Sequence, residues 1–97
     1  MKTLTILHQN FCPYCRMARR AVQELQAEDA RFAAVPVRWI EENAQRAEAA
    51  PYTDYWYVPS LYLEGEKLYE ASPRDGYEDI RAQVRRGLEL AYNENKE

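Results

Sequence analysis

A Cys-Pro-Tyr-Cys segment at residues 12–15 constrains the fold most, because it stands between a predicted strand and a predicted helix. Residues 3–7 alternate polar and apolar side chains, which is typical of a strand. Over residues 17–25 apolar residues recur at helical spacing, with charged and polar residues on the other face. Because proline is favoured at the first position of a helix, we expect Cys12 to be the N-cap and Pro13 the first helical residue.

The whole chain predicts an α/β domain with the element order β-α-β-α-β-β-α. A long helix separates the first two strands, which should be parallel, whereas the last two strands form a hairpin. We therefore expect one mixed four-stranded sheet flanked by three helices. The later elements are expected at residues 35–40 (a strand with Pro36 at its start or on an edge), 41–50 (a short helix), 60–63 and 67–69 (hairpin strands), and from Ser72 or Asp75 to about residue 92 (the final helix).

Length and charge favour one small globular domain over residues 1–97, with a flexible tail at about residues 93–97. Thirteen Lys and Arg against sixteen Asp and Glu give a net charge of −3, which disfavours nucleic acid as a partner. The sequence has no apolar run of the roughly 20 residues that a membrane span needs. Its first residues also lack the apolar region of a signal peptide, so we expect a cytoplasmic monomer without membrane association.

Cys12 and Cys15 are the two cysteines of the chain, and their spacing predicts unequal roles. An N-cap side chain accepts a hydrogen bond from the amide of the second or third helical residue, and Cys15 is the third. That amide and the helix dipole favour the thiolate of Cys12 over its thiol. Cys15, one turn further, should point into the protein and remain a thiol. Cys12 is therefore the predicted nucleophile and Cys15 the predicted resolving cysteine.

Two other uses of the cysteine pair are weaker interpretations. A structural zinc site needs four ligands, and this chain offers one cysteine pair and a single histidine, His8. A metal site would therefore need carboxylates or a second chain. A purely structural disulfide between residues 12 and 15 would close too short a loop to add much stability. Redox catalysis is favoured, and it requires no metal or organic cofactor.

Basic residues near the cysteines leave alternatives open. The predicted helix carries arginines at positions 16, 19 and 20. They could stabilise a thiolate or attract an anionic substrate, or they could form a solvated face with an Arg20–Glu24 ion pair, which we favour. Arg16 is kept as a candidate substrate-binding residue. His8 could tune the thiolate, but a polar residue at a strand end is the favoured interpretation.

Phe11-Cys12-Pro13-Tyr14-Cys15 resembles the active-site motif of glutaredoxins, in the thioredoxin superfamily. The preceding strand, the following helix, Val58-Pro59 and the last helix also fall where that family places them. The resemblance implies a thioredoxin-like fold and a dithiol thiol-disulfide oxidoreductase, with Pro13 and Tyr14 supporting the motif. It also implies that Pro59 is a cis-proline facing the cysteines and that the backbone of Val58 pairs with the substrate.

The substrate and the electron donor stay open. The resemblance implies a disulfide-containing protein or a glutathione mixed disulfide as substrate, and glutathione or a reductase as electron donor. Gln9 and Glu70 stand where glutaredoxins place a lysine and a glycine near glutathione, so glutathione is a possible cosubstrate that we expect to bind weakly. Two alternatives remain: a metal or iron–sulfur binding protein that uses the same cysteines, and an arsenate-reductase-like or redox-sensing relative of the fold.

An aromatic segment, residues 52–59, leads directly into Val58-Pro59. It could form an apolar wall beside the thiols that recognises a ligand, with Tyr57 as a candidate substrate-binding residue. Alternatively, Trp56 and one tyrosine could simply cap the core. The sequence does not separate these two interpretations. Trp39 and Phe32 are expected to be plain core or second-strand residues.

Overall fold

The computed structural model describes residues 2–95, which contain four strands and four helices. In chain order these are β1 (Leu4–His8), α1 (Pro13–Glu28), α2 (Ala30–Ala33), β2 (Val37–Glu41), α3 (Arg46–Ala49), β3 (Ser60–Leu63), β4 (Glu66–Glu70) and α4 (Tyr77–Asn95). The strand order is β2-β1-β3-β4, with β1 parallel to β2 and antiparallel to β3. This is the mixed four-stranded sheet that the sequence predicts.

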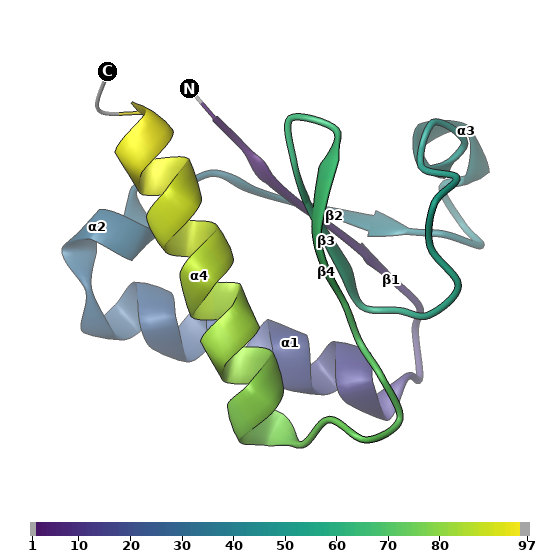
Figure 1. Cartoon of the computed structure of the whole chain (residues 1–97), viewed down its shortest axis with the longest axis horizontal. Helices are drawn as coiled ribbons and strands as arrows, with labels where there is room; N and C mark the ends of the chain where they lie inside the picture. Colours follow the sequence, from purple (N-terminus) through teal and green to yellow (C-terminus); the bar gives the residue numbers. More distant parts are fainter. Residues whose placement is uncertain (1, 96–97) are drawn as a thin grey trace.

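The sheet carries a different layer on each face (Figure 1). α1 and α4 lie together on one face and form the main core with β1 and β3, where Leu4 and Leu88 are fully buried. On the other face, a smaller cluster around Leu7 and Tyr62 lies beneath α3 and the segment after it. Both faces of β1 are therefore covered, which fixes the end of the strand that leads to the cysteines.

The hairpin between β3 and β4 turns through Glu64 and Gly65, both of which have positive φ angles, 51° and 82°. Positive φ at both central residues is the geometry of a type I′ turn, whose twist matches that of the flanking strands. Glycine adopts this region without a steric penalty, so Gly65 suits the second position. The observed turn has two residues, one fewer than the sequence suggested.

Two helical elements between β1 and β3 differ from the expectation. α2 is an additional short helix, at whose start the Asp29 carboxylate accepts a hydrogen bond from the Arg31 amide at 2.9 Å. α3 has four residues and begins only at Arg46. The Glu41 carboxylate accepts the Asn43 amide at 2.6 Å, which holds a turn directly after β2 in place of the predicted helix start.

The predicted caps of the last helix are wrong, because α4 begins only at Tyr77. Ser72 and Asp75 bond to each other instead: the Ser72 amide donates to Asp75 Oδ2 at 3.0 Å, and the Asp75 amide donates to the Ser72 carbonyl at 2.9 Å. These bonds close a turn before the helix. α4 then continues to Asn95, into the predicted tail, whose last two residues, 96–97, lie outside the described residues.

Within residues 2–95, the structure has no helix that combines the length and the apolar character needed to cross a membrane.

Candidate active site

Cys12 caps the N-terminus of α1, as the sequence predicts. Its backbone is extended (φ −91°, ψ 119°) and its sulfur accepts a hydrogen bond from the Cys15 amide at 3.2 Å. The Cys12 carbonyl accepts the Arg16 amide at 3.0 Å, which closes the first helical turn. Pro13 occupies the first helical position, where its missing N–H leaves no unmade hydrogen bond. The half-buried sulfur therefore faces both a backbone amide and the positive end of a long helix.

Cys15 lies on the inner side of the same turn, with only 3% of its surface exposed. The Gln9 amide donates to its sulfur at 3.5 Å. Burial, followed by the hydrogen-bonded contact with Cys12, raises the pKa of Cys15 to about 12. Cys15 is therefore a thiol at neutral pH, and the two cysteines occupy unequal environments.

The Val58–Pro59 peptide bond is cis, the geometry that the resemblance implied. The Val58 carbonyl oxygen lies 3.8 Å from Cys12 Sγ, so residues 46 positions apart meet at the thiol. The Pro59 carbonyl accepts the Ala71 amide at 3.0 Å, which attaches this segment to the end of β4. Figure 1 shows the same proximity, with the β1–α1 junction and the segment before β3 at one end of the sheet.

Tyr14 and Arg16 take different positions around the motif. The Tyr14 hydroxyl donates to the Pro73 carbonyl at 3.1 Å, and its ring packs against the main core. Tyr14 therefore joins the start of α1 to the turn before α4. The Arg16 side chain is exposed and, among the described residues, its guanidinium has no hydrogen-bond or ion-pair partner. It is a free cation one turn beyond Cys12.

The other basic residues near the motif follow the solvated-face interpretation. Arg20 pairs with Glu24 at 3.0 Å. Arg19 stacks over Trp39, 4.7 Å from the ring centroid, and lies 3.4 Å from His8 Nδ1. Burial and the Arg19 charge lower the pKa of His8, so its ring is neutral at pH 7. The contacts of His8 thus run to Arg19 and Trp39, which fits a residue that ends a strand.

The aromatic segment divides into a buried part and an exposed part. The rings of Tyr52 and Tyr55 pack against Tyr62 in the smaller cluster. Trp56 is 91% exposed and Tyr57 57% exposed. The interpretation that Trp56 caps the core is therefore wrong, and tyrosines take that role. Trp56 and Tyr57 therefore remain on the surface, directly before Val58, whose carbonyl lies beside Cys12 Sγ.

A Glu70–Lys67 pair holds the exposed part of this segment. Glu70 Oε2 accepts the amides of Trp56 and Tyr57, each at 2.7 Å, and Glu70 Oε1 accepts Lys67 Nζ at 2.9 Å. Lys67 also donates to the Asp54 carbonyl at 2.6 Å. Burial alone would raise the pKa of Glu70, but these hydrogen bonds lower it below its usual value. We call this arrangement the Glu70 anchor.

The residues before the motif have acidic partners. The Gln9 side-chain amide donates to the Glu42 carboxylate, which also accepts the Tyr55 hydroxyl at 2.6 Å. The Asn10 amide lies 3.4 Å from Glu41 Oε2. Sequence reasoning missed Glu41, Glu42 and the Glu70 anchor, because these partners lie far apart in the chain and carry no motif. Within the described residues, no group of three or more His, Cys, Asp or Glu is placed to hold a metal ion.

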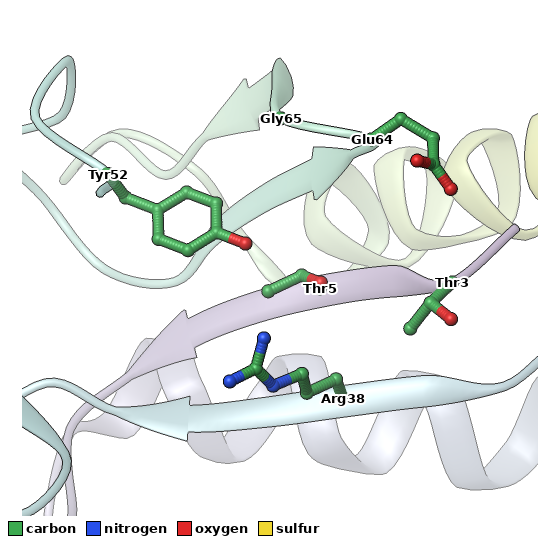
Figure 2. Close-up of a pocket in the computed structure, with 6 residues that line it drawn as sticks. All are labelled: Thr3, Thr5, Arg38, Tyr52, Glu64 and Gly65. Atoms are coloured by element: carbon green, nitrogen blue, oxygen red, sulfur yellow. The ribbon is translucent and has the colours of Figure 1, made fainter. Parts of the chain in front are cut away.

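A separate hollow of about 320 Å³ lies on the face of the sheet opposite α1 and α4 (Figure 2). Figure 2 shows the Arg38 guanidinium and the Tyr52 hydroxyl directed toward Thr5, with Glu64 and Thr3 further along the hollow. Neither cysteine lines it, and none of the predicted site residues does. The hollow is therefore distinct from the surface around Cys12.

We expect iodoacetamide to label Cys12 at least about tenfold faster than Cys15 in the reduced, folded protein at mildly acidic pH. Cys12 is partly exposed and its sulfur accepts an amide, whereas Cys15 is buried with a raised pKa. Mass spectrometry of the labelled peptides gives both rates. The denatured chain is the control and should label both cysteines at similar rates. Faster labelling of Cys15 in the folded protein would reverse the assigned roles.

The chain resembles several known proteins. The family profile described as glutathione S-transferase, N-terminal domain, matches residues 7–73, about two thirds of the 97 residues. No curated protein matches the sequence. A mutant thioredoxin from Halobacterium salinarum is 20% identical, with a TM-score of 0.56, over 90% of this chain and 74% of that one. An oxidized glutaredoxin 2 from Chlamydomonas reinhardtii is 21% identical, with a TM-score of 0.52, over 96% and 81%. A malarial protein is 13% identical, with a TM-score of 0.60, over 91% and 98%. These structures share the fold of this chain.

Proposed function

The chain belongs to the glutathione S-transferase N-terminal domain family, with the predicted thioredoxin-like fold, and we propose that it is a glutaredoxin-like dithiol thiol-disulfide oxidoreductase. The shared fold suggests a redox enzyme in general. The observation that carries the specific proposal is the hydrogen bond of 3.2 Å from the Cys15 amide to Cys12 Sγ at the helix N-terminus. This hydrogen bond stabilises negative charge on Cys12 Sγ, whereas Cys15 is a buried thiol.

The first step is attack by the Cys12 thiolate on one sulfur of a substrate disulfide. The substrate S–S bond breaks, its other sulfur leaves as a thiolate, and a mixed disulfide forms on Cys12. The Cys15 amide and the helix dipole lower the energy of the attacking thiolate. The substrate backbone would pair with the backbone of Val58, a role supported by the Val58 carbonyl lying 3.8 Å from Cys12 Sγ.

The second step is attack by Cys15 on Cys12 Sγ, which releases the substrate as a thiol and leaves a Cys12–Cys15 disulfide. Cys15 must first lose its proton, and its raised pKa is held partly by contact with Cys12. Loss of negative charge from Cys12 in the mixed disulfide removes the part of this shift that comes from that charge. The overall reaction moves two electrons from the dithiol to the substrate, and an external reductant restores the dithiol. This chemistry needs no metal or organic cofactor.

Reduction of insulin disulfides with dithiothreitol as electron source tests the activity. We expect turnover that depends on both cysteines. Absence of turnover together with metal bound to the purified protein would overturn the proposal in favour of the metal-binding alternative. Cytoplasmic location and a monomeric state stay predictions.

We expect weak use of glutathione as electron donor, although the family name makes it a candidate. The Gln9 side chain is hydrogen-bonded to Glu42 and carries no positive charge. Compared with a lysine at this position, its attraction for glutathione is weaker by about 1 kcal/mol at an exposed contact, or roughly fivefold to tenfold in affinity. An NADPH-coupled assay compares glutathione plus glutathione reductase with thioredoxin reductase as the source of electrons. Introducing the cation with Gln9→Lys should raise the glutathione-coupled rate, and Gln23→Lys, on the exposed face of α1, is the matched control. Equal rates for Gln9→Lys and wild type would contradict this account.

A further inference from the structure

Large exposed aromatic side chains belong to the two segments of the chain that meet at the thiol of Cys12. Phe11 is 96% exposed, Trp56 91% and Tyr57 57%, and these are the large apolar residues that stand out as exposed in the described structure. Phe11 directly precedes Cys12, and Tyr57 precedes Val58, whose carbonyl lies 3.8 Å from Cys12 Sγ. We call Phe11, Trp56 and Tyr57 the aromatic rim. Aromatic residues gathered at one exposed place mark a contact surface for another molecule.

The aromatic rim is held in place by its backbone. The Glu70 anchor binds the amides of Trp56 and Tyr57, and Ser60 Oγ donates to the Tyr57 carbonyl at 2.6 Å. Phe11 has a φ of 65°, in the left-handed region that residues other than glycine rarely adopt. An exposed ring on a strained backbone contributes little to folding, so a binding role explains it better. Because the backbone of Trp56 and Tyr57 is already held, less conformational entropy is lost when a partner binds.

Carboxylates border the aromatic rim on the side of β2 and β4. Glu41 and Glu42 accept hydrogen bonds from the two residues before Phe11. Asp54 accepts the Tyr62 hydroxyl at 2.7 Å, and Glu70 accepts the Trp56 amide. Hydrogen bonds from the backbone amides of Asn43, Asn10 and Ala44 lower the pKa of Glu41, so this carboxylate is ionised at neutral pH. Lys67 neutralises part of this charge. The free cation Arg16 belongs to α1, and Arg74 belongs to the turn before α4.

We infer that the aromatic rim and its carboxylate border select polypeptide disulfides whose cysteine is flanked by apolar and basic residues, in preference to glutathione mixed disulfides. Apolar side chains would cover Phe11 and Trp56, and a lysine or arginine would lie toward the carboxylates. Glutathione has no large apolar side chain and carries two carboxylates against one ammonium group, so it matches neither feature. The inference rests on the proposed function, because it concerns the substrate of the same thiol.

Four mixed disulfides with thionitrobenzoate test this selectivity. Three are pentapeptides with a central cysteine: Lys-Leu-Cys-Phe-Lys, the same peptide with both lysines replaced by glutamate, and the same peptide with Leu and Phe replaced by serine. The fourth is glutathione. The Cys12 thiolate attacks the peptide sulfur, the S–S bond to thionitrobenzoate breaks, and the released thionitrobenzoate anion is measured by its absorbance. Hydroxyethyl disulfide, which is small and uncharged, reports the reactivity of the thiol alone.

We expect the reduced protein to release thionitrobenzoate from Lys-Leu-Cys-Phe-Lys with a second-order rate constant at least about tenfold above that for each other mixed disulfide, equivalent to about 1.4 kcal/mol. Its advantage over the glutamate peptide should shrink at high salt, because exposed charges are then screened. In Trp56→Ser, the rate on this peptide divided by the rate on hydroxyethyl disulfide should fall about fivefold to tenfold. Glu66→Ser, at the exposed start of β4, is the matched control and should leave the ratio unchanged.

The outcomes separate this inference from the proposed function. If hydroxyethyl disulfide is reduced but the flanking residues make no difference, or glutathione reacts fastest, the selectivity inference is overturned and the oxidoreductase proposal stands. If no disulfide is reduced, both are overturned. Because Trp56 is 91% exposed, its replacement should leave the fold intact, which circular dichroism checks. Tyr57→Ser is a second variant of the aromatic rim. If neither Trp56→Ser nor Tyr57→Ser changes the ratio of the peptide rate to the hydroxyethyl disulfide rate, the inference is also overturned.

Discussion

Replacing Cys12 with serine should lower disulfide reduction by at least about a thousandfold, because a serine hydroxyl stays protonated at neutral pH and forms no disulfide. The fold should survive. Serine is among the preferred N-cap residues, and its oxygen can accept the Cys15 amide that now bonds to the sulfur. Thermal unfolding should therefore show a melting temperature equal to or above that of the wild type. Loss of activity with an intact fold would assign the effect to the chemistry of the thiol.

Cys15→Ser should behave differently from Cys12→Ser. Cys12 can still attack a substrate, but the mixed disulfide then has no internal thiol to resolve it. We expect the variant to accumulate a covalent complex with a polypeptide substrate, visible as an added mass that a reductant removes. Turnover without added glutathione should fall by at least about a hundredfold.

The control for both variants is Gln23→Ser, which places the same new residue on the exposed face of α1. It should match the wild type in turnover and form no covalent complex. A fully active Cys15→Ser variant would show that an external thiol resolves the intermediate. An active Cys12→Ser variant would remove Cys12 from the mechanism altogether.

The sequence predicted the junction between β1 and α1 well because the determinants of that junction are local. An extended N-cap, a proline at the first helical position and the third-position amide all lie within four residues of Cys12. The same reasoning placed the sheet, since strand length and hairpin spacing are short-range properties. The prediction from sequence was less successful where other local hydrogen bonds competed with a helix cap. The Ser72–Asp75 turn uses the residues that a helix cap would use, and α4 begins later as a result.

The partners around the thiol were not predictable in the same way. Glu70 contacts Trp56, fourteen residues away, and Gln9, directly after β1, contacts Glu42, directly after β2. No periodicity or motif links residues at such separations. Trp56 is a further example, because apolar character predicts burial only on average. Its exposure follows from tyrosines filling the smaller cluster and from the amide contacts of the Glu70 anchor.

Replacing Glu70 with alanine should lower the free energy of unfolding by about 2 kcal/mol, or about 10 °C in melting temperature. The carboxylate is largely buried, with 17% of the side chain exposed, and accepts hydrogen bonds from Trp56, Tyr57 and Lys67. Alanine leaves all three donors without this partner. Because the same segment continues into Val58-Pro59, kcat/KM on hydroxyethyl disulfide should also fall several-fold. Urea unfolding and the disulfide assay measure the two effects.

The contribution of Glu70 should depend on pH in a defined direction. Its hydrogen bonds hold the pKa below the ordinary value of 4.5, so the folded state favours the ionised carboxylate more than the unfolded chain does. This stability is fully present above pH 4.5 and is lost as the pH falls through the folded-state pKa. Glu70→Gln does not titrate at this position. The difference in unfolding free energy between wild type and Glu70→Gln should therefore be largest near pH 7 and shrink toward pH 3.

Glu66→Ala is the matched control for Glu70→Ala, because it removes an exposed glutamate from the same strand. It should change the unfolding free energy by less than about 0.5 kcal/mol.

The Glu70→Gln variant separates two possible roles for Glu70. If its charge acted mainly by repelling glutathione, Glu70→Gln would bind glutathione more tightly with little loss of stability. Because the carboxylate is directed to two amides and a lysine, we expect lost stability and less than about a twofold gain in glutathione affinity. A stable Glu70→Gln variant with much tighter glutathione binding would contradict the anchoring role.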